Sequence, residues 1–166
     1  MYSSIKSSAI GLSFLFLCGV AVLFCPATVQ AQAANPGDIV ISQVYGGGGN
    51  PGSTYQNNFI ELFNRSSATI DISGWPLHFA SASGSFNVPV PLTSTRSVSI
   101  APGRYLLIQL GPSSSNGAPL PFPDLFIPID AANIATSGKL AFTKPGINLV
   151  GTCPLPNANV IDFVGW

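Results

Sequence analysis

The side chains that could carry out chemistry are few in this sequence. His78 is the single histidine, so any histidine-based catalytic or metal site would have to be built around it. It lies in Trp75–Phe79, where it alternates with apolar neighbours, and we expect it at the surface of a strand with a structural role. No serine stands in the Gly-x-Ser-x-Gly turn that presents a hydrolase nucleophile. The sequence therefore predicts that this chain is not an enzyme.

The carboxylates that could serve as acids, bases or ligands are scattered, and they include Glu61, Asp71, Asp124, Asp130 and Asp162. Glu61 lies in an otherwise apolar segment, so its charge must be paired or face solvent, and Arg65 or Arg104 could pair with it. Asp124 and Asp130, with carbonyls of the proline-rich loop before them, could hold calcium, which takes hard oxygen ligands. No spaced Asp/Asn loop supports that site, and we predict no metal and no cofactor.

Four consecutive glycines, Gly46, Gly47, Gly48 and Gly49, raise the question of an anion-binding loop. A phosphate cradle needs glycines that lead into a helix N-terminus, usually with a following Gly-Lys-Ser/Thr. Here the glycines lead toward the strand-like segment 59–64, and no lysine follows. We interpret the run as a connection between strands, in which glycine lets the backbone pack closely or adopt a positive φ.

The segments that would position these side chains are short, apolar and separated by turn residues. The chain holds 17 glycines and 15 prolines, spread between the apolar runs. About eight short strands with frequent turns predict an all-β sandwich, and the absence of β-α-β alternation disfavours a Rossmann-like or barrel enzyme. We place the strands near residues 39–45, 59–64, 68–72, 75–79, 97–100, 105–110, 139–142, 147–150 and 160–166.

The N-terminus differs from the rest of the chain. Lys6 supplies a positive charge, residues 9–24 form an uninterrupted apolar run, and a small-residue stretch ends at Ala33. We predict a secretory signal-peptide helix over residues 1–33 that is cleaved after Ala33. A permanent anchor is the alternative, but the run is short for a spanning helix of about 20 residues.

The expected mature protein is a secreted domain over residues 39–166, joined to the signal by a short linker, 34–38, and without a membrane span. Six basic and six acidic residues leave no dominant charged patch, which disfavours strong nucleic-acid binding. Cys153 is the single cysteine that remains after cleavage, so it pairs with another chain, stays free, or lacks its partner. Because the chain also ends on the apolar run 160–166, we expect a domain that is incomplete at its C-terminus.

Six motifs in a fixed order resemble the lamin-tail domain in its bacterial secreted form. They cover nearly all of the chain from Ile39 onward, and they are Ile41–Gly49, Asn58–Asn64, Asp71–Trp75, Pro102–Leu106, Thr136–Leu140 and Val160–Gly165. The resemblance implies an immunoglobulin-like β-sandwich. It also implies structural roles for motif residues, namely Gly46, Gly47, Gly48, Gly49, Phe59, Glu61, Asn64, Gly74, Trp75, Gly103, Tyr105, Gly138, Asp162 and Gly165.

The same resemblance implies an accessory function, because the bacterial members are often joined to extracellular nucleases or phosphoesterases. We expect a secreted, non-catalytic module that binds or positions an unknown protein, a cell-surface component or another extracellular partner. The alternative is the N-terminal accessory part of a secreted nuclease or phosphoesterase whose catalytic domain lies outside this chain. Scaffolding of DNA or protein, suggested by eukaryotic relatives, is a weaker analogy of fold.

Overall fold

The computed structural model describes residues 33–86, 89–92, 97–129 and 134–166. These residues form ten strands and no helix, which confirms the predicted all-β class. No described segment is therefore a helix that could cross a bilayer. The predicted signal peptide lies outside the described residues up to residue 32. Its cleavage and the boundaries of the linker stay predictions.

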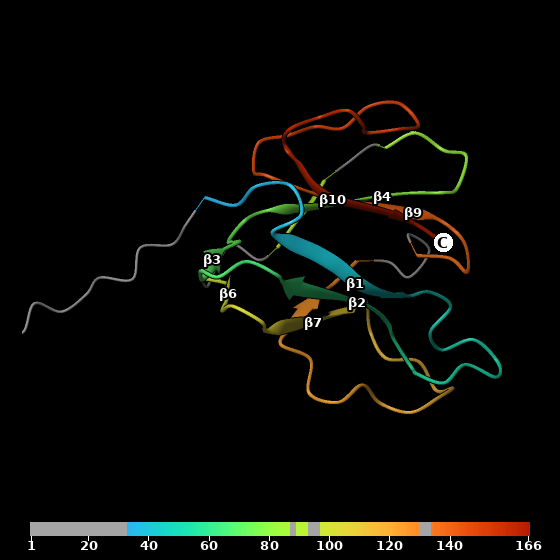
Figure 1. The fold of residues 1–166 in the computed structure, drawn as a ribbon. Coiled ribbons are helices and arrows are strands. Elements are labelled where there is room, and N and C mark those ends of the chain that lie inside the picture. Colours follow the sequence, from blue (N-terminus) through green and yellow to red (C-terminus); the bar gives the residue numbers. More distant parts are fainter. Residues whose placement is uncertain (1–32, 87–88, 93–96, 130–133) are drawn as a thin grey trace, which may run out of the picture.

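Two four-stranded sheets pack against each other as a sandwich (Figure 1). The first sheet has the order β1 (Ile39–Tyr45), β2 (Asn58–Asn64), β7 (Tyr105–Leu110) and β8 (Leu125–Ile127). The second sheet has the order β10 (Val160–Gly165), β9 (Lys139–Thr143), β4 (Pro76–Ala80) and β5 (Val90–Pro91). A separate ribbon pairs β3 (Ile70–Asp71) with β6 (Ser99–Ile100). Neighbouring strands run antiparallel, except that β8 runs parallel to β7.

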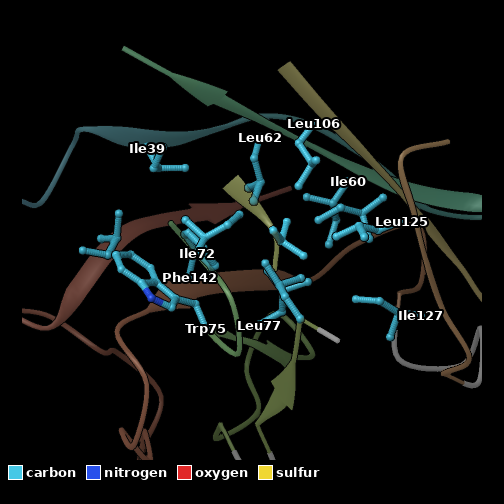
Figure 2. Packing of buried hydrophobic residues seen from close by; sticks show 14 of the residues in the cluster. Ile39, Ile60, Leu62, Ile72, Trp75, Leu77, Leu106, Leu125, Ile127 and Phe142 are labelled. Carbon is cyan, nitrogen blue, oxygen red and sulfur yellow. The ribbon is translucent and has the colours of Figure 1, made fainter. Parts of the chain in front are cut away.

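The core forms between the two sheets because each long strand alternates apolar and other side chains. In β2, Ile60 and Leu62 point inward and are fully buried, while their neighbours point away. From the second sheet, Leu77 of β4 and Phe142 of β9 enter the same cluster (Figure 2). Trp75, at the turn into β4, packs its ring 5.5 Å from that of Phe142. Each such side chain contributes about 1.5–3 kcal/mol through burial.

The structure corrects the strand placement at three points. The expected strand at residues 147–150 is a loop, whose Leu149 is buried against Phe86, Ala141 and Val160 on the outer surface of the second sheet. Apolar side chains can be buried there without backbone pairing, so their pattern alone resembles that of a strand. The short strands β5 and β8 were not predicted, because each spans two or three residues beside prolines.

The two sheets meet along one side of the sandwich, where the edge strands β1 and β10 lie in contact (Figure 1). Each edge strand carries a β-bulge, between Ile41 and Gln43 in β1 and between Val160 and Asp162 in β10. A bulge leaves one residue unpaired in the ladder and bends the strand locally. The Gly37 amide donates to the Ile161 carbonyl at 2.8 Å, which adds a backbone link between the segments.

Candidate functional site

The outer surface of the first sheet carries a concentration of aromatic side chains. Ile60, Leu106 and Ile108 point into the core, so the residues that alternate with them point outward. We call this outer surface the aromatic face, and its side chains are Gln43, Tyr45, Phe59, Glu61, Phe63, Tyr105, Leu107, Gln109 and Phe126. Tyr105 is 58% exposed and Phe126 is 48% exposed, which leaves large apolar surface in solvent.

One end of the aromatic face is built from three interlocked rings. Tyr45 and Phe59 are paired across β1 and β2 and stack with centroids 5.2 Å apart. Tyr55, in the loop before β2, meets Tyr45 edge-on at 5.5 Å and Phe59 at 5.7 Å. The Tyr45 hydroxyl accepts a hydrogen bond from the Thr54 amide at 2.9 Å. These contacts hold the rings in fixed positions.

The other end of the aromatic face carries the pair of Phe63 and Tyr105. The register places these two residues opposite each other, and their ring centroids lie 4.5 Å apart. Leu107 and Gln109 follow Tyr105 on the same side of β7, and Gln109 lies opposite Phe126 of β8. The face therefore extends across all four strands of the first sheet.

Glu61 lies at the centre of the aromatic face, flanked by Gln43 and Leu107 in the neighbouring strands. The Ser42 hydroxyl, at the bulge of β1, lies 2.7 Å from Glu61 Oε1 and 3.1 Å from the Glu61 carbonyl. This contact differs from the pairing with Arg65 or Arg104 that the sequence suggested. The bulge turns a serine toward the carboxylate and so fixes the orientation of Glu61 within the sheet.

The outer surface of the second sheet is covered instead by the chain's own loops. Phe86, Leu149 and Val160 lie over Ala141 and form a small second cluster. Lys139 extends beneath this cover, donates to the Thr152 carbonyl at 2.6 Å, and holds its ammonium 5.5 Å from the centre of the Phe86 ring. Among the described residues the two outer surfaces therefore differ, since Phe86 and Leu149 cover Ala141 on the second sheet, whereas Tyr105 and Phe126 on the first sheet stay about half exposed.

The prediction that His78 lies at the surface is wrong. His78 pairs with Ala141 on the covered side of the second sheet and has an exposed fraction of 0%. Thr143 donates its hydroxyl proton to the Lys144 carbonyl at 3.0 Å, so it accepts from His78 Nε2–H at 3.1 Å. This assigns the Nε2–H tautomer and leaves Nδ1 without a described hydrogen-bond partner. Burial lowers the pKa of His78, which keeps the ring neutral and structural.

The glycine run forms a close backbone contact with the loops around it. A side chain at Gly46 would meet the Ala135 carbonyl, and one at Gly48 would meet the Asn57 backbone. A hollow of about 350 Å³ lies between Gly47, Gly48 and the segment 134–136. The Gly48 amide donates to the side chain of buried Asn58 at 2.6 Å, so that amide is already occupied. The loop accordingly acts as a packed connection, and its geometry does not resemble a phosphate cradle.

Other motif residues lie at turns and strand ends and contribute no side chain to the aromatic face. Asn64 donates to the carbonyls of Ala68 at 2.8 Å and Ile100 at 2.7 Å, which joins β2 to the small ribbon. Gly74 and Gly103 adopt positive φ at turns. Gly138 lies next to Gly165 at the end of the β9–β10 pair. A side chain at Gly138 would overlap the Trp166 ring.

The remaining candidate groups do not converge. Asp124 Oδ2 accepts from the Leu107 amide at 2.8 Å, while Asp130 lies outside the described residues. Asp71 accepts from the Ser73 amide, and hydrogen bonds from Ser73 lower the pKa of this carboxyl. Within the described residues, no three His, Cys, Asp or Glu side chains gather as a metal site. Cys153 is exposed and carries a free thiol.

Parts of the aromatic face were predictable from the sequence, but the face as a whole was not. The alternation of Phe59, Glu61 and Phe63 on one side of a strand was visible in the sequence. Their alignment with Tyr45, Tyr105 and Phe126 depends on the strand order and on the parallel β8, which was not predicted. The signal that could have found it is the i, i+2 spacing of Tyr105, Leu107 and Gln109 in β7.

Comparison with known proteins adds one identification. No curated protein matches the chain. The family model described as Lamin Tail Domain matches residues 32–166, a span that includes both sheets and every strand described above. The resemblance to the lamin-tail domain drawn from the six sequence motifs is thereby confirmed, and the sandwich agrees with the immunoglobulin-like fold, while the bacterial secreted form of the domain stays a prediction. The chain belongs to the lamin tail domain family.

Proposed function

We propose that this protein is a secreted, non-catalytic module that binds an extracellular or cell-surface partner through the aromatic face. The observation that carries this proposal is the asymmetry between the two outer surfaces. On the second sheet Phe86 and Leu149 cover Ala141, whereas the first sheet leaves Tyr105 and Phe126 about half exposed. Large apolar side chains that stay half exposed on one side of a sheet favour an interaction site there.

The internal contacts of the aromatic face support a binding role. The Tyr45, Tyr55 and Phe59 rings are held by mutual contacts, and Glu61 is oriented by Ser42. A rigid surface loses little conformational freedom when it binds, which favours affinity. Membership in the family supports an immunoglobulin-like domain module, and the signal-like N-terminus of the sequence supports secretion.

The proposal is tested by expressing the full chain in a bacterial host and analysing the product. We expect the N-terminus of the exported protein to follow Ala33, as read by intact mass. We also expect no hydrolysis of DNA, RNA or phosphoesters by the purified protein, with and without added Ca²⁺ or Mg²⁺. Hydrolysis that a single substitution in this chain abolishes would overturn the non-catalytic role, and retention of the uncleaved chain in the cell would overturn secretion.

A second candidate is an accessory role beside a secreted nuclease or phosphoesterase. The exposed thiol of Cys153 favours it, because an unpaired cysteine in an oxidising compartment can form a covalent link to another domain or chain. Reading the gene beyond the Trp166 codon tests this candidate. A continuing frame that encodes a second cysteine and a hydrolase domain would support it, and a stop codon at that point would exclude a catalytic domain in the same polypeptide.

A further inference from the structure

We propose that the aromatic face binds a neutral polysaccharide. This inference rests on the proposed binding function and names the class of ligand. Sugar rings have an apolar face of C–H groups and a rim of hydroxyls, so their sites need flat aromatic rings beside hydrogen-bonding side chains. The aromatic face offers both, with Tyr105 and Phe126 as exposed rings and Gln43, Glu61 and Gln109 among the rings.

The rings match the electrostatics of a sugar face. An aromatic ring carries negative charge density over its surface, which attracts the weakly positive C–H groups of a pyranose. Phe63 packs against one side of Tyr105 at 4.5 Å and limits the motion of that ring, while 58% of Tyr105 stays in solvent. Phe126 lies one strand away, opposite Gln109. A chain of several sugars could contact both rings along the sheet.

A third aromatic residue is displayed beside the face. Phe122 is 98% exposed and adopts φ 32°, a left-handed conformation that is uncommon for any residue other than glycine. Prolines on both sides restrict the backbone. Two residues later the Asp124 amide donates to the Leu107 carbonyl at 2.9 Å, so this loop is fixed to β7 beside the aromatic face. A strained, fully exposed aromatic residue is consistent with a binding role.

The polar groups of the face fit hydroxyls. Glu61 can accept hydrogen bonds, and Gln43 and Gln109 can both donate and accept them. Ser42 orients the Glu61 carboxylate, and the Gln109 amide contacts the Gly111 carbonyl at 3.3 Å. These side chains could form hydrogen bonds with several hydroxyls of one sugar at once. Such bonds are needed because a polar group that is buried without a partner costs free energy.

The charge of the face favours a neutral ligand over a charged one. The strands β1, β2, β7 and β8 contain no lysine or arginine, and Glu61 is their single charged residue. Arg65 and Arg104 lie just outside β2 and β7, at one end of the face only. A polyanion or an anionic membrane would meet a carboxylate at the centre, whereas neutral sugars carry no charge that the face must balance.

The test is affinity electrophoresis of the purified full chain in gels that contain soluble β-glucan, xylan, galactomannan or α-glucan, with sedimentation on cellulose and chitin. We expect retardation by at least one of these neutral polymers. Tyr105→Ala and Phe126→Ala should each weaken that binding about tenfold, which corresponds to about 1.4 kcal/mol. Val150→Ala is the matched control, because Val150 is 80% exposed in the loop that covers the second sheet. Its binding should be unchanged, and thermal melting should show that all variants are folded.

Three results would overturn the proposal. The first is that the protein binds none of the neutral polymers. The second is that Tyr105→Ala and Phe126→Ala bind as well as the unmodified protein. The third is selective binding to alginate, heparin or anionic phospholipid vesicles. Self-association that Tyr105→Ala abolishes, in the absence of glycan binding, would show that a second copy covers the face. Failure to bind neutral polymers, or selective binding to a polyanion or a vesicle, leaves secretion, the lack of hydrolysis and a binding role for the face untouched, so the polysaccharide proposal can fail while the proposed function stands. Binding that the face variants leave intact would also remove the aromatic face from the proposed function.

Discussion

The carboxylate of Asp162 in β10 accepts a hydrogen bond from the backbone amide of Ile41 in β1 at 2.7 Å, across 121 positions of sequence. Its second oxygen accepts from the Phe163 amide at 2.9 Å. One side chain therefore occupies a backbone donor in each of two edge strands that belong to different sheets. A charge-assisted hydrogen bond of this kind is stronger than one between neutral groups.

Replacing Asp162 with Ala should lower the free energy of unfolding by about 1.5–3 kcal/mol, because the part-buried Ile41 amide loses its acceptor. Asp162→Asn keeps an acceptor oxygen and should lose less. Urea unfolding followed by circular dichroism measures both variants. Equal stability of Asp162→Ala and the unmodified protein would show that water replaces the carboxylate without cost.

Replacing Trp75 with Ala should cost about 3–5 kcal/mol, since its ring fills the core against Phe142. Phe122→Ala is the control, because Phe122 is almost fully exposed and its side chain supports no core. Denaturant titration by circular dichroism compares the two. A loss below about 1 kcal/mol for Trp75→Ala would mean that the surrounding core closes over the vacated space.

Replacing Gly48 with Ala should destabilise the domain by more than about 2 kcal/mol, because the added methyl group would overlap the Asn57 backbone. Gly52→Ala is the matched control in the same loop. Its side chain would enter open space, so only its positive φ adds a cost of about 1 kcal/mol. Melting temperatures of the two variants should differ clearly, and similar values would argue against close packing of the glycine run.

The stability of the domain should depend on the protonation of His78. Burial lowers the pKa of His78 in the folded state, so the unfolded chain binds the proton more readily. The contribution of neutral His78 is therefore complete above the ordinary pKa of about 6.5 and declines as the pH falls through that value toward the folded pKa. Urea midpoints between pH 8 and pH 5 test this. His78→Gln should show a smaller decline over the same range, and an identical profile would exclude His78 as the cause.

Where no second cysteine follows in the same polypeptide, Cys153 should form a disulfide between two copies of the exported protein, because its thiol is exposed and unpaired. Electrophoresis without reductant should show a dimer that dithiothreitol converts to monomer. The same gel should show Cys153→Ser as a monomer under both conditions. A free thiol in the exported protein, measured by mass spectrometry after alkylation, would contradict the dimer.

The sequence predicted the elements whose patterns are local. The bounds of β1 and β7 were predicted as observed, because both segments have a strand-like apolar pattern and both are flanked by turn residues. It failed where burial depends on distant segments. His78 has the local pattern of a half-exposed strand, but it pairs with Ala141 beside the cluster that contains Phe86 and Leu149, and it is fully buried. Ser42, which orients Glu61, becomes visible only once the bulge is known.

The contact between Asp162 and Ile41 also bears on whether other chains can add strands to the sheet edges of this protein. An open strand edge is a template on which another chain can add a strand, and repeated addition leads to fibrils. Asp162 occupies one outward amide in β1 and one in β10, and its charge resists burial beneath an incoming strand. The carboxylate that links the two sheets thus also occupies backbone donors that an added strand would need.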